Sequence, residues 1–113
     1  MHAGDDVRLH HMLDAANEAI TFAAGRARAD LDIDRMLVHA LVRCIEIIGE
    51  AASQVTVPYR ELHPELPWAA IVGMRNRLVH AYFDVDLDRV WDTVQQDLPD
   101  LVRNLEPLVS KSE

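Results

Sequence analysis

Apolar positions recur at helical steps in three long segments of the chain. Over residues 5–24 and 32–52, apolar side chains return every three or four residues, which predicts two helices, each with one buried face. A third segment with this spacing follows Asp84 and Asp86, which can cap its start, and runs to near the C-terminus. The stripe of the second segment consists of Ile33, Met36, Leu37, Ala40, Leu41, Cys44, Ile45, Ile48 and Ala52. We expect long helices that pack through these stripes.

Glycine and proline mark where the helical pattern breaks. Gly25 suits the end of the first helix. Three prolines fall within VPYRELHPELP, residues 57–67, and predict a loop with one helical turn around Tyr59 to Leu62. Pro67 suits the first turn of a further helix, which we expect to continue through residues 68–82. Pro99 is expected to kink the last helix rather than end it.

The length and composition fit a single helical domain. A chain of 113 residues has the size of one ordinary domain, and half of its residues are apolar while Gly and Pro are few. We therefore predict one domain over residues 1–113, an all-α antiparallel bundle of about four main helices. The single cysteine, Cys44, cannot form an internal disulfide, and no apolar run reaches the roughly 18 residues of a membrane span. We expect a cytoplasmic location, with no membrane as partner.

The charge distribution points to one unusual segment. A net charge of −8 argues against a general nucleic-acid binder, because such proteins neutralise phosphates with Lys and Arg. Between Glu65 and Asp84, however, no acidic residue occurs, and this window contains RNRLVHAY at residues 75–82. Any RNA-directed role must therefore use this local basic site. Trp68 and Trp91, on apolar helical stripes at either side of it, are expected to be core anchors.

Three residues of this segment carry the chemistry that RNA cleavage through the 2′-hydroxyl needs. His80 can move protons near neutral pH, and Arg75 can grip phosphate oxygens with two parallel hydrogen bonds. Asn76 can orient a neighbour or bind substrate. On one continuous helix, His80 would lie well round the circumference from Arg75. Long side chains, a local distortion or a second copy of the chain would then be needed to bring them together.

The spacing of these residues also fits a structural role. An Arg followed five residues later by a His is common, and both could be satisfied in a hydrogen-bond network between helices. Taken alone, the spacing favours this structural interpretation over catalysis. His10 and Asp14 have the spacing of a helical metal pair, but two ligands on one helix do not make a site. We predict no metal site.

The wider sequence around the segment carries a resemblance. PWAAIVGMRNRLVHAYFDVDLDRVW, together with IIGEAA at residues 47–52 and DLPDL at residues 97–101, resembles the HepT family of HEPN-domain ribonuclease toxins. The hallmark of that family is Arg, four residues, His, one residue, Tyr. Arg75, His80 and Tyr82 match it, and the similarity extends over essentially the whole chain.

The resemblance implies a specific activity and specific partners. It implies a homodimeric bundle with a metal-independent endoribonuclease site between the copies, no cofactor, and Arg75, Asn76 and His80 as the catalytic set. It implies an RNA substrate such as tRNA or mRNA. It further implies a type VII-like toxin–antitoxin pair, in which an MntA-like minimal nucleotidyltransferase transfers AMP to Tyr82, with higher assembly between toxin and antitoxin. Arg77 and Glu50 are candidate supporting residues.

Two other functions remain open at this point. The chain could be a non-catalytic helical module whose basic segment docks a nucleotidyltransferase or a nucleotide. It could also be a structural dimerising bundle, in which replacing Arg75 or His80 would reduce stability rather than activity.

Overall fold

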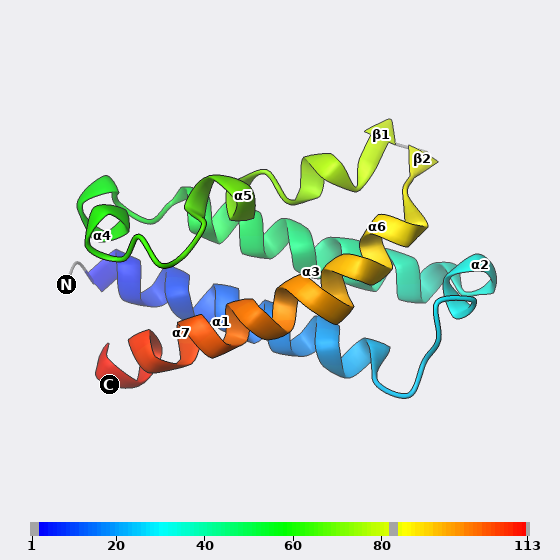
Figure 1. The fold of residues 1–113 in the computed structure, drawn as a ribbon, viewed down its shortest axis with the longest axis horizontal. Helices are drawn as coiled ribbons and strands as arrows, with labels where there is room; N and C mark the ends of the chain where they lie inside the picture. The colour runs from blue at the N-terminus through cyan, green and yellow to red at the C-terminus, as the bar shows by residue number, and fades with distance from the viewer. Residues whose placement is uncertain (1–2, 82–83, 113) are drawn as a thin grey trace.

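Three long helices form the body of the protein. The computed structural model describes residues 3–81 and 84–112 (Figure 1). Helix α1 (Ala3–Ala23) packs along α3 (Arg35–Ser53) and also contacts α7 (Leu98–Ser112). The expected all-α bundle is therefore confirmed, and its first and second long helices lie close to the predicted segments. No helix in the described part of the chain is both long and apolar enough to cross a membrane.

Shorter elements connect the long helices. They are α2 (Asp30–Ile33), α4 (Val57–Leu62), α5 (Trp68–Val72), the 3₁₀ helix η1 (Arg75–Arg77), α6 (Leu87–Asp92) and the π-helical turn η2 (Thr93–Asp97). Strands β1 (Val79–Ala81) and β2 (Asp84–Val85) pair antiparallel. As predicted, α1 ends just before Gly25, whose φ of 75° suits a glycine, and one short helix lies within the proline-rich segment.

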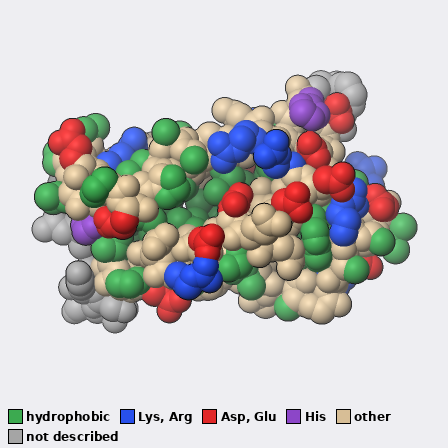
Figure 2. All heavy atoms as spheres, in the orientation of Figure 1, with side chains coloured by type: hydrophobic (Ala, Val, Ile, Leu, Met, Phe, Trp, Pro, Cys, Tyr) green, Lys and Arg blue, Asp and Glu red, His purple; other side chains and the backbone are tan. Residues whose placement is uncertain are grey.

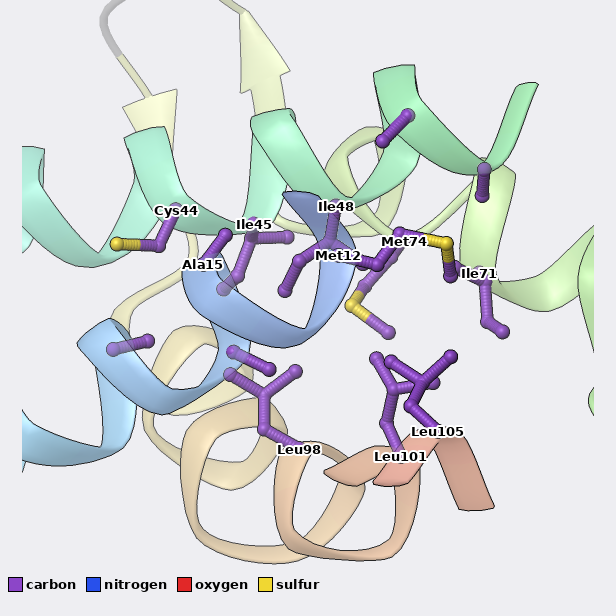
Figure 3. Close-up of a cluster of buried hydrophobic side chains, with 14 of the residues drawn as sticks. Met12, Ala15, Cys44, Ile45, Ile48, Ile71, Met74, Leu98, Leu101 and Leu105 are labelled. Carbon is purple, nitrogen blue, oxygen red and sulfur yellow. The ribbon is translucent and has the colours of Figure 1, made fainter. Parts of the chain in front are cut away.

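The core joins all the main helices. Figure 3 shows side chains from α1, α3 and α7 converging with those at the end of α5; the labelled residues are Met12, Ala15, Cys44, Ile45, Ile48, Ile71, Met74, Leu98, Leu101 and Leu105. All are buried. Trp68 is also buried and donates its indole N–H to the carbonyl of His63 at 2.9 Å, and Trp91 packs half-buried against the core. Both tryptophans are anchors, as expected.

The predicted second helix is divided near its start. Asp34 has an extended backbone, with φ −119° and ψ 91°, and its carboxylate accepts a hydrogen bond from the amide of Leu37 at 3.0 Å. It therefore caps α3 and separates it from α2. The prediction that Ile33 and Met36 belong to the buried stripe is wrong, because each is 83% exposed. Ile33 precedes the cap, so its position does not follow the helical phase of α3.

The last predicted helix contains a local irregularity. Asp86 caps α6 by accepting the amide of Arg89 at 3.0 Å, while Asp84 lies on β2 and is not the cap. Between α6 and α7 the chain forms the π turn of residues 93–97, which ends two residues before Pro99. Proline lacks an amide proton and its ring crowds the carbonyl four residues earlier, so a wider turn relieves both constraints. Helical structure continues through Pro99, so the proline does not end it, as predicted, and the irregularity beside it is this π turn.

A buried carboxylate ties the first helix to the far end of α3. Asp5 is 1% exposed and accepts hydrogen bonds from the amide and the hydroxyl of Thr56, at 2.8 and 2.7 Å. Arg60 donates to the carbonyl oxygens of Ala52, Ser53 and Val55 at the same corner. These bonds satisfy backbone groups that the end of α3 leaves unpaired, and they hold the turn from α3 into α4.

Burial of Cys44 has a consequence that pH can measure. Burial, and then the nearby Glu18 carboxylate, raise the pKa of the Cys44 thiol to about 11. An unfolded cysteine has a pKa of about 8.5. The folded state therefore binds this proton more tightly, so its contribution to stability is complete below about pH 8.5 and is lost as the pH rises toward 11.

We expect urea unfolding of the wild type to show a loss of stability between about pH 8.5 and 11 that Cys44→Ala lacks. The folded thiol should also resist iodoacetamide at pH 8 until the protein unfolds, because the reactive species is the thiolate. Equal pH dependence of the two proteins above pH 8.5 would contradict this.

Candidate functional site

The segment that contains Arg75 and His80 is not a continuous helix. Helix α5 ends at Val72, where the amide of Gly73 bonds to the carbonyl of Ala69 at 3.1 Å, and η1 follows. The expectation of one helix through residues 68–82 is therefore wrong. The chain instead turns into β1, because the carbonyl of Leu78 accepts the amide of Asp86 at 2.7 Å and the strands pair. Asn76 and His80 consequently do not stack on one helical face.

Arg75 and Asn76 lie beside α3 because two backbones approach closely there. A Cβ atom added at Gly49 would stand 3.2 Å from the carbonyl oxygen of Val72 and 3.5 Å from that of Ile71. Glycine therefore allows the end of α5 to rest directly on α3. The result is a groove of about 280 Å³, called here the Arg75 groove, lined by Glu46, Gly49, Glu50, Ser53, Val72, Arg75 and Asn76.

Acidic side chains of α3 face the basic segment. The Nε of Arg75 lies 3.5 Å from a carboxylate oxygen of Glu46, and Glu50 lies 3.9 Å from a guanidinium nitrogen of Arg43. The absence of acidic residues between Glu65 and Asp84 predicted a local basic site. In the fold, however, the carboxylate of Glu46 lies beside Arg75 of that site. Glu46 and Glu50 lie four positions apart on α3 and both line the Arg75 groove. The pairing of Glu46 with Arg75 joins residues 29 positions apart, which no local pattern indicates.

His80 lies on β1 and has its own carboxylate neighbour. Its Nε2 is 3.8 Å from an oxygen of Asp86, and the His80 side chain is 64% exposed. Asp86 also holds the hairpin to α6, because its amide bonds to Leu78 and its carboxylate caps the helix. The sequence predicted the cap but not the contact with His80. Asp86 thus both caps α6 and places a carboxylate beside His80.

The remaining predicted residues are placed differently. Arg77 points to the other side of η1, where its guanidinium donates to the carbonyl of Ala70 at 2.9 Å, and it does not line the Arg75 groove. Glu50 does line that groove. Tyr82 falls outside the described residues. Within the described part of the chain, no three His, Cys, Asp or Glu side chains converge as a metal-binding group would.

The arrangement offers exposed groups for acid–base and phosphate chemistry. The side chain of Arg75 is 47% exposed, so both it and His80 are accessible to a large substrate. Neither makes a hydrogen bond through its side chain to another described residue. A structural network between helices would bury and satisfy these groups. Arg75 and His80 instead make partly exposed ion-pair contacts with carboxylates on neighbouring elements.

These features describe an all-α protein with an exposed Arg, Asn and His set on a short turn and hairpin. The sequence of this chain matches the family described as "Ribonuclease HepT-like" over residues 12–108. It is 42% identical to "Probable ribonuclease HepT" of Thermococcus cleftensis, over 70% of this chain and 72% of that protein. It is 34% identical to "Putative RNase TTE0752" of Caldanaerobacter subterraneus, over 93% and 94% of the two chains.

A similar relation holds for "Putative RNase MJ1380" of Methanocaldococcus jannaschii, which is 35% identical over 87% of this chain and 90% of that protein. No solved structure gives a significant match to the chain. The family match covers most of the chain, and these relatives are matched over more than two thirds of their length. The chain therefore belongs to the HepT-like ribonuclease family, as its resemblance implied.

The close contact at Gly49 predicts a separation of stability from activity. In Gly49→Ala the added methyl group should push the end of α5 away from α3 by a few tenths of an ångström. A better helix former gains up to about 1 kcal/mol, which offsets part of that strain. We expect nearly unchanged unfolding in urea but several-fold slower RNA cleavage, with a larger loss in Gly49→Val. Cleavage by Gly49→Val at the wild-type rate would contradict the role of this contact.

Proposed function

We propose that this protein is a metal-independent endoribonuclease in which Arg75, Asn76 and His80 are the catalytic set. The observation that carries the proposal is the exposure of Arg75 and His80 on adjoining short elements in a chain of the HepT-like ribonuclease family. Each side chain faces a carboxylate rather than a hydrogen-bonded core network. Both can therefore leave their present neighbours when a phosphate arrives.

The chemistry follows from the residue types. The 2′-oxygen of a ribose attacks the adjacent phosphorus while a base accepts the hydroxyl proton. The bond from phosphorus to the 5′-oxygen breaks, and an acid supplies a proton to that oxygen. His80 moves these protons, Arg75 offsets charge that develops on the phosphate oxygens, and Asn76 orients the substrate. The products are a 2′,3′-cyclic phosphate and a 5′-hydroxyl end.

We further propose that two copies of the chain form the complete site. Arg75 lies against α3, whereas His80 lies against Asp86 at the start of α6. A single copy also offers one motif histidine, while the reaction needs one proton to be taken and one to be given. A homodimer that places two motifs face to face would supply both. Glu50, on the rim of the Arg75 groove, is a supporting residue in this arrangement.

Regulation by a nucleotidyltransferase is the second part of the proposal. An MntA-like antitoxin would transfer AMP from ATP to the hydroxyl of Tyr82, so that an oxygen–phosphorus bond to the tyrosine forms and pyrophosphate leaves. Tyr82 follows His80 by two positions in the sequence. An AMP group there would place a phosphate near His80 and Arg75 and compete with RNA for them. The protein would then be the toxin of a type VII-like toxin–antitoxin pair.

The test is RNA cleavage in the presence of EDTA, by protein whose intact mass shows no added nucleotide. Arg75→Ala should lose about 100-fold or more in rate, as happens when a donor to a developing oxyanion is removed. Arg75→Lys should fall between this variant and the wild type, because it keeps the charge but not the paired hydrogen bonds. Arg35→Ala, an exposed arginine that starts α3, is the matched control.

Two results would oppose the proposal. Wild-type activity in Arg75→Ala would remove that residue from the catalytic set. Absence of cleavage by folded, unmodified wild type over a broad set of RNAs would favour the non-catalytic binding module instead.

A further inference from the structure

A second groove lies on the opposite side of η1 from the Arg75 groove. It has a volume of about 380 Å³ and is bounded by α5 and η1 on one side and by α6, η2 and α7 on the other. We call it the Arg77 groove. Its lining residues are Pro67, Ala70, Ile71, Met74, Arg77, Arg89, Asp97, Asp100, Leu101 and Asn104. A volume of this size suits a small molecule or a single nucleotide.

The groove has an apolar floor and carries charges of both signs, with Arg77 on the η1 side and Arg89, Asp97 and Asp100 on the side of α6, η2 and α7. Figure 2 shows a hollow between α5 and α7, with hydrophobic side chains inside it and both basic and acidic side chains around its edge. Arg77 and Arg89 line it from η1 and α6, whereas Asp97 and Asp100 line it from η2 and α7. A ligand with an apolar body, an anionic group and hydrogen-bond donors would complement these side chains.

The charged groups are available to such a ligand to different degrees. Asp100 pairs with Arg103, and Arg77 is steadied by its bond to the carbonyl of Ala70. Within the described part of the chain, neither the guanidinium of Arg89 nor the carboxylate of Asp97 has a side-chain partner. Asp97 ends the π turn, and such turns occur often at functional sites. One unpaired cation and one unpaired carboxylate thus face the same groove.

We infer that the Arg77 groove binds a guanine nucleotide. Guanine presents two neighbouring N–H donors, at N1 and N2, which one carboxylate can accept together, and Asp97 is an acceptor of that kind. On the corresponding edge adenine presents a donor beside an acceptor. The carboxylate of Asp97 would repel that acceptor. Arg77 and Arg89 bind the phosphate, and the apolar floor packs against the ring.

The position of the groove links it to RNA. Arg77 directly follows Arg75 and Asn76 on η1, so a nucleotide held by Arg77 would lie across this short helix from the Arg75 groove. This part rests on the proposed function: the guanine nucleotide can be one residue of an RNA substrate. The same chemistry would also accept a free guanine nucleotide, and the experiment separates these two sources.

The experiment measures equilibrium binding of GMP and AMP by calorimetry. We expect GMP to bind about tenfold more tightly than AMP, the discrimination expected of a well-placed bidentate contact to a base. Asp97→Asn should remove this preference, and Arg89→Ala should weaken both nucleotides. Asp92→Asn on α6 and Arg35→Ala on α3 are exposed, charge-matched controls outside the groove and should bind as the wild type does.

Competition with RNA identifies the source of the nucleotide. In a His80→Ala background, short single-stranded RNAs that differ in one position, G or A, are tested for displacement of GMP. Displacement by the G-containing RNA alone assigns the groove to the RNA substrate, and displacement by neither assigns it to a free nucleotide. Equal binding of GMP and AMP, no binding of GMP, or an unchanged preference in Asp97→Asn would overturn the inference.

These outcomes are independent of those for the proposed ribonuclease. GMP binding needs no cleavage, so it can persist in a protein that fails to cut RNA. Conversely, cleavage by a protein without guanine preference would support the proposed ribonuclease activity and contradict the proposed guanine site in the Arg77 groove.

Discussion

Replacing His80 with alanine is expected to slow RNA cleavage by about 100- to 10,000-fold, the usual contribution of a positioned acid–base group. His80 is 64% exposed, and its nearest charged neighbour, Asp86, is 3.8 Å away. Little packing is lost when its ring is removed, so the folded state should keep its stability. His80→Gln should be about as inactive, because glutamine can hydrogen-bond but cannot transfer a proton near neutral pH. The rates are measured in EDTA on one defined RNA.

The control for this experiment is His39→Ala. His39 is an exposed histidine on α3 outside the grooves that flank η1, and its removal should leave the rate unchanged. Circular dichroism and urea unfolding establish that both variants are folded. An undiminished rate in folded His80→Ala would rule out the catalytic assignment. A loss of stability with no change in the rate per folded molecule would restore the structural interpretation.

Replacing Leu78 with alanine is expected to produce the largest loss of stability near the site. Leu78 is 0% exposed and lies between η1 and β1, so it anchors the segment that carries Arg75 and His80 in the core. Deleting a buried leucine side chain to alanine costs about 2–5 kcal/mol through lost transfer energy and the cavity left behind. Urea unfolding should show this loss. Cleavage by the fraction that remains folded should also fall, because both flanks of the motif lose their anchor.

Leu62→Ala is the matched control. Leu62 is 74% exposed on α4, and substitutions at such surface positions usually change stability by less than about 0.5 kcal/mol. If the two leucine variants unfolded at the same urea concentration, Leu78 would not anchor the motif. If Leu78→Ala were destabilised but cleaved normally at low temperature, its role would be confined to the core.

The long helices could be predicted because their stripes are local patterns. The buried residues of α3 from Leu37 to Ala52 repeat at helical steps, and the sequence predicted that stripe. Ile33 and Met36 fit the same period but are exposed: Ile33 lies before the cap at Asp34 and outside α3, and Met36 lies in the first turn of α3. Apolar periodicity does not reveal where a cap divides the pattern. The carboxylate of Asp34 acts on a single amide, which is a weaker signal in sequence than the stripe around it.

The helical path predicted for the candidate site is wrong, whereas the roles predicted for its residues are untested. Arg75, Asn76 and His80 were identified from the sequence, and the structure places them on exposed short elements. Their path was predicted as a helix because residues 68–82 contain enough apolar residues at helical steps. Closure of the hairpin by Asp86 and the approach permitted by Gly49 depend on contacts made after the chain folds. The catalytic role of the three residues stays a prediction.

The pairing of Arg75 with Glu46 and of His80 with Asp86 also bears on selectivity. If RNA binds as proposed, its phosphates must compete with these carboxylates for Arg75 and His80. A polyanion that presents phosphates in the wrong geometry must displace both carboxylates without gaining compensating contacts. When a correctly shaped RNA binds, its phosphates replace the two carboxylates as the anionic neighbours of Arg75 and His80. Discrimination can then come from rejecting wrong partners, so that a strongly acidic protein ignores most of the nucleic acid around it.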